Sequence, residues 1–359
     1  MKVAFITRSS LFLSSGGDTL QVLNTAKHLE ELRVNVDIKL THEQINYEAY
    51  DLLHFFSVIR PADILPHIRK SRKPFVVTPL LIDYSEFDKQ FRKGFTGIVF
   101  RFFSPDQIEY LKTIARWTRR QQRLRSFSYV LKGQRSSIKY ILMKAALILP
   151  NSAMEYEQMT RLYAIASPYN IIPNGIEPGL FNNSCEVEKD KHMVLSVARI
   201  EGLKNQINLI RALNNSEYQL YIIGKPAINQ IKYYEECRSL AAKNIHFVNH
   251  IPQKDLLPFY QKAKVHILPS WFETCGLSSL EAAATGCNIV ITPKGFAPEY
   301  FQDHAFYCDP SSPASIKQAI DSASTADTCK VFQQKILSDF TWQNAASKTY
   351  EAYKQILPI

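Results

Sequence analysis

The sequence predicts an α/β protein with two doubly wound domains, each a mostly parallel sheet covered by helices. Three observations carry this prediction. The chain has 359 residues, enough for about two domains. Short apolar runs alternate with helical patterns, as they do in βαβ units. These runs form two series, separated by a segment rich in Pro, Gly and Asn over residues 173–183, which is typical of a linker.

Each apolar run predicts one strand. The first series predicts strands at Val3–Thr7, Val36–Leu40, Leu52–Phe56, Phe75–Thr78, Leu147–Leu149 and Ile171–Pro173. The second series predicts strands at Val194–Ala198, Gln219–Ile223, Ile245–Val248, Val265–Leu268 and Ile289–Thr292. The last helical pattern, Trp342–Ile356, is expected to pack back on the first half. We therefore expect domains at residues 1–178 and 179–339, with residues 340–359 returning to the first.

Composition excludes several classes of protein. A hydrophobic fraction of 46% and a charged fraction of 21% exclude disorder as the main state. Six cysteines without a Cys-x-x-Cys pair favour neither a disulfide scaffold nor a zinc ribbon, so reduced cytosolic thiols are expected. No apolar run approaches the roughly 18–20 residues that a membrane-crossing helix needs. The first run stops at Arg8 and predicts a strand rather than a signal peptide. We expect a cytoplasmic protein.

Positive charge is concentrated in one segment. The net charge is +10, and residues 89–144 contain 14 Lys and Arg against two acids, which makes +12 there and −2 elsewhere. A helix over Asp106–Arg125, at about 100° per residue, gathers five cations on one arc. They are Lys112, Arg116, Arg119, Arg120 and Arg123, and the opposite half holds Leu111, Ile114, Ala115 and Trp117. The pattern indicates a patch facing a phosphate-bearing acceptor or an anionic membrane. The alternatives are a solvated face and a nucleic-acid-binding module, although no recognised nucleic-acid motif is present.

The loop after the predicted strand 265–268 carries the strongest chemical signal. It contains Glu273, a helix is expected to begin near Gly276–Ser278, and Glu281 lies about one turn into that helix. The amides of residues 275–277 (Cys275, Gly276 and Leu277) would lie at the positive end of the helix dipole, which suits an anion or a polyol. Two carboxylates suit the vicinal hydroxyls of a sugar or ribose. The alternative is a helix N-terminus capped by acids.

Two further loops follow predicted strands. Arg199 and Lys204, separated by a turn with a glycine, are placed to clamp a diphosphate. The alternative for Arg199 is a surface salt bridge with Glu201. Gly16 and Gly17 follow the first strand and allow the backbone to approach a ligand closely, the alternative being a plain tight turn. They do not form the G-x-G-x-x-G motif of dinucleotide sites.

In order and spacing these motifs resemble the retaining family 4 glycosyltransferases of the GT-B fold, of the bacterial cell-surface glycan type. The linker reads Asn174-Gly175-Ile176-Glu177, the basic pair is Arg199 and Lys204-Asn205, and the acids are Glu273 and Glu281. Ile222-Ile223-Gly224 and Asn249-His250-Ile251-Pro252 also match. The resemblance is dense over residues 150–310 and thinner before them. The stretch Thr274–Ser278 departs from the family's usual residues. The family's His after an N-domain strand is missing here, which leaves His54, Asp83 and Glu86 as candidates for that contact.

The resemblance implies a role for each matching residue. Arg199 and Lys204 would neutralise the diphosphate leaving group, Glu273 would hold the donor sugar with the amides of Cys275, Gly276 and Leu277, and Glu281 would bind the ribose. Gly16 and Gly17 would face the diphosphate and sugar from the other domain, and Gly224, His250 and Ile251 would lie by the base.

The implied fold is GT-B, with two Rossmann-like domains facing a cleft. The implied reaction is retaining transfer of a sugar from a UDP- or GDP-linked donor to a glycan or lipid-linked glycan. It would take place at the cytoplasmic membrane face, in cell-surface polysaccharide biosynthesis. No Asp-x-Asp metal motif is present, so neither a metal nor a cofactor is expected. The alternative reaction is that of a nucleotide-sugar epimerase or hydrolase on the same scaffold.

Overall fold

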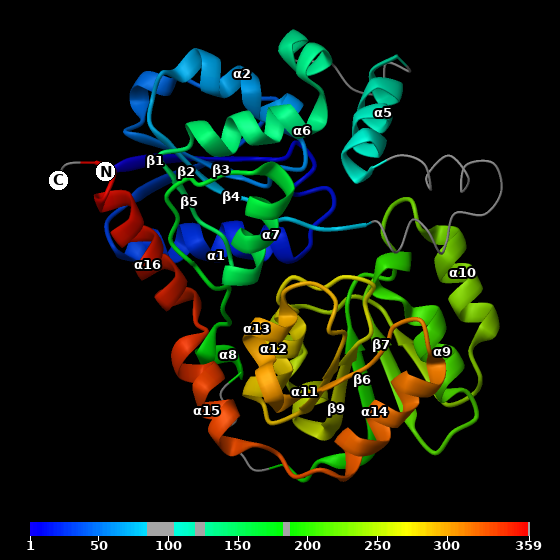
Figure 1. Cartoon of the computed structure of the whole chain (residues 1–359). Helices are drawn as coiled ribbons and strands as arrows, with labels where there is room; N and C mark the ends of the chain where they lie inside the picture. Colours follow the sequence, from blue (N-terminus) through cyan, green and yellow to red (C-terminus); the bar gives the residue numbers. More distant parts are fainter. Residues whose placement is uncertain (85–103, 119–125, 182–186, 358–359) are drawn as a thin grey trace. The chain divides into compact units, whose positions relative to one another are not determined.

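The computed structural model describes residues 1–84, 104–118, 126–181 and 187–357 (Figure 1). It divides into two compact units, each an α/β unit with its own parallel sheet. Unit 1 is Met1–Pro173 with Trp342–Ile359, and unit 2 is Asn174–Thr341. The expected boundaries lay at 178/179 and 339/340. None of the helices in the described ranges combines the length and apolarity needed to cross a membrane.

Unit 1 contains a five-stranded sheet in the order β2-β1-β3-β4-β5, in which all neighbouring strands are parallel. The strands are β1 Lys2–Thr7, β2 Asn35–Leu40, β3 Leu52–Phe56, β4 Phe75–Thr78 and β5 Leu147–Ile148. Its helices are α1 Gly17–Glu31, η1 Tyr47–Ala49, α2 Pro61–Ser71, α5 Pro105–Thr118, α6 Phe127–Lys144, α7 Ala153–Tyr163 and α16 Trp342–Lys354. The predicted strand Ile171–Pro173 does not form. Of this stretch, only Ile172 donates a hydrogen bond to the neighbouring backbone within the described residues, to Pro150 O at 2.8 Å, and Pro173 has no N–H to donate.

The C-terminal helix belongs to unit 1. Helix α16 packs beside α1 and places the Tyr353 hydroxyl 2.6 Å from His54 Nδ1. The other ring nitrogen, Nε2, lies 2.8 Å from Thr78 Oγ1. Burial lowers the pKa of His54 to about 3, so the ring is neutral at pH 7. His54 is thus a core residue that connects α16 to the sheet by hydrogen bonds. Asp83 is half-buried, and Glu86 lies outside the described residues.

Unit 2 contains a six-stranded parallel sheet in the order β11-β10-β9-β6-β7-β8. The strands are β6 Asp190–Val197, β7 Gln219–Ile223, β8 Ile245–Val248, β9 Ala263–Leu268, β10 Asn288–Ile291 and β11 Ala305–Tyr307. The helices are α8 Pro178–Phe181, η2 Gly202–Lys204, α9 Gln206–Leu213, α10 Ile231–Leu240, η3 Gln253–Asp255, α11 Leu257–Lys262, α12 Leu277–Ala284, α13 Ala297–Phe301, η4 Gln302–His304, α14 Pro313–Thr325 and α15 Lys330–Asp339. Strand β11 was not predicted from the sequence, because it is a three-residue edge strand whose residues are only half-buried.

Both faces of the unit 2 sheet are covered. Val194 and Leu195, neighbours on β6, are fully buried on opposite faces. Leu195 packs in the same core cluster as Leu280 of α12, and Val194 in the cluster of Ile320 of α14. Strand β6 pairs with β7 on one side and β9 on the other, so the chain changes winding direction there. The carboxyl ends of β6 and β9 therefore form the point of this sheet where ligands bind in doubly wound folds.

Helix α5 does not present the face that the sequence analysis expected. Ile108 is buried and the Tyr110 hydroxyl donates to Val130 O at 2.9 Å, whereas Leu111 is 47% and Trp117 is 42% exposed. The prediction that Leu111 and Trp117 pack inward is wrong, because α5 contacts α6 through the Ile108–Tyr110 side. Of the predicted basic face, Lys112 pairs with Glu109 at 2.6 Å. The side chain of Arg116 and all of Arg119, Arg120 and Arg123 lie outside the described residues.

Candidate functional site

A lysine and a glutamate meet at the change of winding in unit 2. Lys204 follows β6 and Glu273 follows β9, and Lys204 Nζ lies 2.7 Å from Glu273 Oε2. Both side chains are largely buried, with 19% and 8% exposed. The Ser270 hydroxyl donates to the same oxygen at 3.0 Å. Within the described part of the chain, nothing donates to Glu273 Oε1, so one carboxylate oxygen remains for a ligand.

The Glu273 backbone is fixed by the loop that follows β10. Glu273 N donates to Lys294 O at 3.0 Å, and Phe296 N donates to Glu273 O at 2.8 Å. Gly295, with φ of 104°, forms a bridge with Glu273, and a Cβ at this glycine would lie 2.2 Å from Glu273 O. Only glycine permits both this conformation and this approach. Gly295 is not among the residues predicted from the sequence, although a glycine just after a buried strand was an available signal.

Asn205 fixes the loop that carries Lys204. It adopts a left-handed conformation with φ of 60°, which asparagine tolerates better than most residues. Its buried side chain donates from Nδ2 to Pro269 O at 2.9 Å and to Pro310 O at 2.7 Å. It thereby ties together the segments that follow β6, β9 and β11. In the sequence, Asn205 stands only as part of a motif and has no predicted role of its own.

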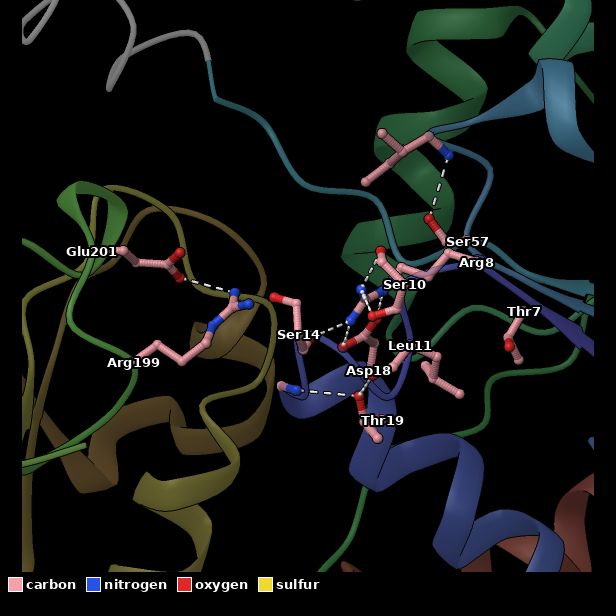
Figure 2. Close-up of polar contacts among 12 residues, drawn as sticks. Thr7, Arg8, Ser10, Leu11, Ser14, Asp18, Thr19, Ser57, Arg199 and Glu201 are labelled. Atoms are coloured by element: carbon pink, nitrogen blue, oxygen red, sulfur yellow. Dashed lines mark hydrogen bonds and ion pairs between the residues drawn. The ribbon is translucent and has the colours of Figure 1, made fainter. Parts of the chain in front are cut away.

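Arg199 contacts Glu201, the pairing that the sequence left open as an alternative. Nη2 lies 2.9 Å from Glu201 Oε1, and the Arg199 side chain is 36% exposed (Figure 2). Gly224 packs closely against the backbone of Ala198, the residue before Arg199. Its φ is 154°, and a Cβ at this position would lie 1.9 Å from Ala198 O. The structure thus gives Gly224 a backbone role, whereas its predicted place beside a base stays a prediction.

The helix after Glu273 begins where the sequence analysis expected. Gly276 is the N-cap of α12, in a left-handed conformation with φ of 69°, and the helix starts at Leu277. No described group accepts a hydrogen bond from the Gly276 or Leu277 amide. Cys275 is buried, and its Sγ lies 3.6 Å from Asn174 Nδ2. The helix start therefore offers two backbone donors beside Glu273.

Glu281 is buried and already hydrogen-bonded. Gln253 Nε2 donates to Oε1 at 2.5 Å, and the Tyr260 hydroxyl donates to Oε2 at 2.8 Å. Burial raises the pKa of Glu281 to about 7, and the two hydrogen bonds oppose this rise. Gln253 and Tyr260 were not predicted from the sequence, because they belong to no recognised motif. The ribose-binding role of Glu281 stays a prediction.

The remaining predicted residues lie at other strand ends. His250 is exposed and Ile251 half-buried, both after β8. Gly16 and Gly17 lie in unit 1, where Gly16 is the N-cap of α1 and its amide donates to Thr19 Oγ1 at 3.2 Å. Of the predicted catalytic residues, the structure thus joins Lys204 to Glu273 directly and pairs Arg199 with Glu201.

Comparisons with known proteins show which family and which solved structures this chain is similar to. Residues 182–335 match the family described as Glycosyl transferases group 1. An uncharacterized glycosyltransferase of Methanocaldococcus jannaschii is 26% identical over 209 residues, which are 51% of this chain and 53% of that protein. The chain spans about half or less of the length of the first curated relatives it matches.

Solved structures match over the whole chain. Sucrose-phosphate synthase from Thermosynechococcus elongatus superimposes with a TM-score of 0.76 at 16% identity, covering 99% of both chains. Anabaena HepE in complex with UDP-glucose gives a TM-score of 0.70 at 16% identity, covering 99% of this chain and 100% of that one. Residues 182–335 thus match the glycosyl transferases group 1 family, and the two parallel-sheet units of the chain have the GT-B fold.

Proposed function

We propose that this protein is a retaining glycosyltransferase that moves a sugar from a nucleotide diphosphosugar to an acceptor. The observation that carries the proposal is the Lys204–Glu273 pair at the β6/β9 strand ends, with Glu273 Oε1 open and two helix amides beside it. It lies in the region that matches the glycosyl transferases group 1 family. The structural neighbour HepE is in complex with UDP-glucose, which supports a UDP-linked donor, and a GDP-linked donor is the alternative.

In this proposal the two cations change partners when the donor binds. Lys204 leaves Glu273, Arg199 leaves Glu201, and both donate to diphosphate oxygens. As the glycosidic bond breaks, negative charge grows on the departing diphosphate, and preorganised donors stabilise it. Glu273, released from Lys204, accepts from a hydroxyl of the donor sugar. The acceptor hydroxyl attacks from the leaving-group face and gives its proton to the departing phosphate, which retains the anomeric configuration.

Thermal-shift measurement against a panel of nucleotides and nucleotide sugars tests the donor. At 100-fold its dissociation constant, the true donor should stabilise the protein by ~2.7 kcal/mol. Transfer from that donor should survive excess chelator, and the product should keep the donor's anomeric configuration, read from NMR coupling constants. An inverted product would remove the retaining mechanism. Nucleotide release that no acceptor accelerates would favour the hydrolase or epimerase instead.

We further propose that the acceptor is a lipid-linked glycan reached by peripheral binding to the cytoplasmic membrane face. The +12 charge of residues 89–144 supports this, and so do Leu111 and Trp117, which α5 exposes beside Lys112. Lys and Arg each contribute ~1 kcal/mol at an anionic surface, and exposed Trp favours the interface.

Sedimentation with anionic and zwitterionic vesicles across a salt series tests the membrane proposal. Anionic vesicles should bind the protein at low salt and release it at high salt. Changing Arg116, Arg119 and Arg123 to Glu should abolish vesicle binding and leave nucleotide affinity unchanged. Equal binding to both lipids would contradict the proposal, and loss of nucleotide binding would assign the patch to the donor site.

A further inference from the structure

The sheet of unit 1 also contains a point at which the chain changes winding direction. In the reaction proposed above, no residue at this point has a role. Strand β1 lies between β2 and β3 in the order β2-β1-β3-β4-β5. In doubly wound sheets of this order, ligands bind outside the carboxyl ends of β1 and β3. The segment after β1 is residues 8–16, which we call the β1–α1 loop, and the segment after β3 begins at Ser57. The residues that set the conformation of the β1–α1 loop therefore also set the shape of a surface that faces the ligand.

A single guanidinium organises this loop. Arg8 donates from Nη1 to Ser10 O and Oγ, both at 2.9 Å, and from Nη2 to Ser14 O at 2.7 Å (Figure 2). It also binds Asp18 in the first turn of α1, from Nε to Oδ2 at 2.5 Å and from Nη2 to Oδ1 at 3.1 Å. These five contacts match the five N–H donors of arginine. All of them are used inside residues 8–18, so none is left for a substrate.

The loop is held from its other side by Thr19. Its hydroxyl donates to Leu11 O at 3.1 Å and accepts from Gly16 N at 3.2 Å. Leu11 is buried, while Phe12 and Leu13 at the tip are 56% and 78% exposed. The base of the loop is therefore fixed, and its tip and the Gly16–Gly17 helix start are presented outward. Arg8 and Asp18 are partly buried, with 20% and 28% of their side chains exposed, which shelters the pair from solvent.

We propose that Arg8 is a positioning residue, which with Asp18 holds the β1–α1 loop in the shape that sugar transfer requires. This inference rests on the proposed function. Arg8 acts through the loop backbone and not on the donor itself. Lysine at this position keeps the charge but has only three donors on one nitrogen, which cannot reach Ser10, Ser14 and both Asp18 oxygens together. The Arg8→Lys variant therefore removes the hydrogen-bond geometry of the guanidinium while it keeps the positive charge.

The first experiment measures hydrogen exchange in the ligand-free chain, independently of any activity. In Arg8→Lys and in Asp18→Asn, the amides of Leu11, Ser14 and Thr19 should exchange at least tenfold faster than in the wild type, and peptides from α2 should be unchanged. Arg69→Lys, an exposed arginine on α2, is the matched control and should behave as the wild type. Unchanged exchange in Arg8→Lys would overturn the role of the guanidinium.

The second experiment measures UDP release from saturating UDP-glucose in the presence of a lipid-linked glycan acceptor, together with the dissociation constant for UDP. Arg8→Lys should lower the maximal rate at least tenfold and leave UDP affinity within twofold of the wild type. Faster hydrogen exchange together with an unchanged maximal rate of UDP release would show that transfer does not need this loop conformation. A parallel loss of UDP affinity would assign Arg8 to binding. If the wild type turns over no nucleotide sugar, the proposed function fails and the transfer half of this inference fails with it, while hydrogen exchange still decides whether Arg8 holds the loop.

Discussion

With a lipid-linked glycan acceptor present, Lys204→Ala should lower UDP release from saturating UDP-glucose by about 10²–10³, the loss typical of one preorganised donor to a developing oxyanion. Lys204 Nζ lies 2.7 Å from Glu273 Oε2 in a pair with 19% and 8% of the side chains exposed. Removing the lysine leaves a sheltered carboxylate without its cation, which destabilises the fold by up to about 3–5 kcal/mol. Activity must therefore be measured together with the unfolding midpoint.

Two variants separate chemistry from folding. Lys204→Met combined with Glu273→Gln removes both charges at similar volume, so stability should recover while turnover stays low. Arg199→Ala breaks a more exposed pair, worth about 0–1 kcal/mol, and should lose a similar factor in turnover with the fold unchanged. Lys191→Ala, at an exposed lysine of β6, is the control. Near-normal turnover in Lys204→Ala and Arg199→Ala would contradict the diphosphate clamp.

Glu281→Gln should remove a pH dependence of stability. Burial raises the pKa of Glu281 from its ordinary value of 4.5 to about 7. The folded chain thus binds this proton more tightly than the unfolded chain. The stabilisation is fully present below pH 4.5 and is lost as pH rises through about 7, by about 3 kcal/mol in total at ~1.36 kcal/mol per pH unit. Urea titrations give the free energy of unfolding at each pH. Between pH 4.5 and pH 8, the difference in this free energy between the variant and the wild type should shift by about 3 kcal/mol in favour of the variant.

The same residue should make nucleoside binding depend on pH. The ionised carboxylate accepts from two ribose hydroxyls, whereas the protonated form accepts less. Wild-type affinity for uridine should therefore rise about tenfold between pH 6 and 8, as expected for a group that ionises near 7. Uridine is the probe because it carries no phosphate that titrates in this range. Glu281→Gln should bind weakly at every pH.

Glu273→Gln is the matched control for these titrations. It should keep the wild-type pH profile for uridine and lose turnover, because Glu273 is proposed to hold the sugar. If both glutamine variants weakened uridine equally, the split roles of Glu273 and Glu281 would be wrong. If Glu281→Gln kept the wild-type slope of stability against pH, another group would be responsible for it.

The sequence alone determined most strands of the fold and the loops that carry chemistry. Apolar runs located β3 and β4 to the residue, because both strands are buried along their whole length and read as nearly continuous apolar segments. Gly276 marked the start of α12, because a helix entered from a left-handed residue favours glycine. The alternation of strands and helices predicted two doubly wound units, since short βαβ connections allow few other topologies.

Only the tertiary structure decided which side chains meet. Lys204 and Glu273 are 69 residues apart, and their contact depends on β6 and β9 being neighbours, which local patterns do not encode. Gly295 fixes Glu273 by a close backbone approach, and Gln253 and Tyr260 reach Glu281 from separate elements. The buried face of α5 was predicted wrongly for the same reason, because periodicity identifies an apolar stripe but not the neighbouring element that covers it. Local sequence specifies backbone conformation, whereas site geometry arises from long-range packing that the sheet order selects.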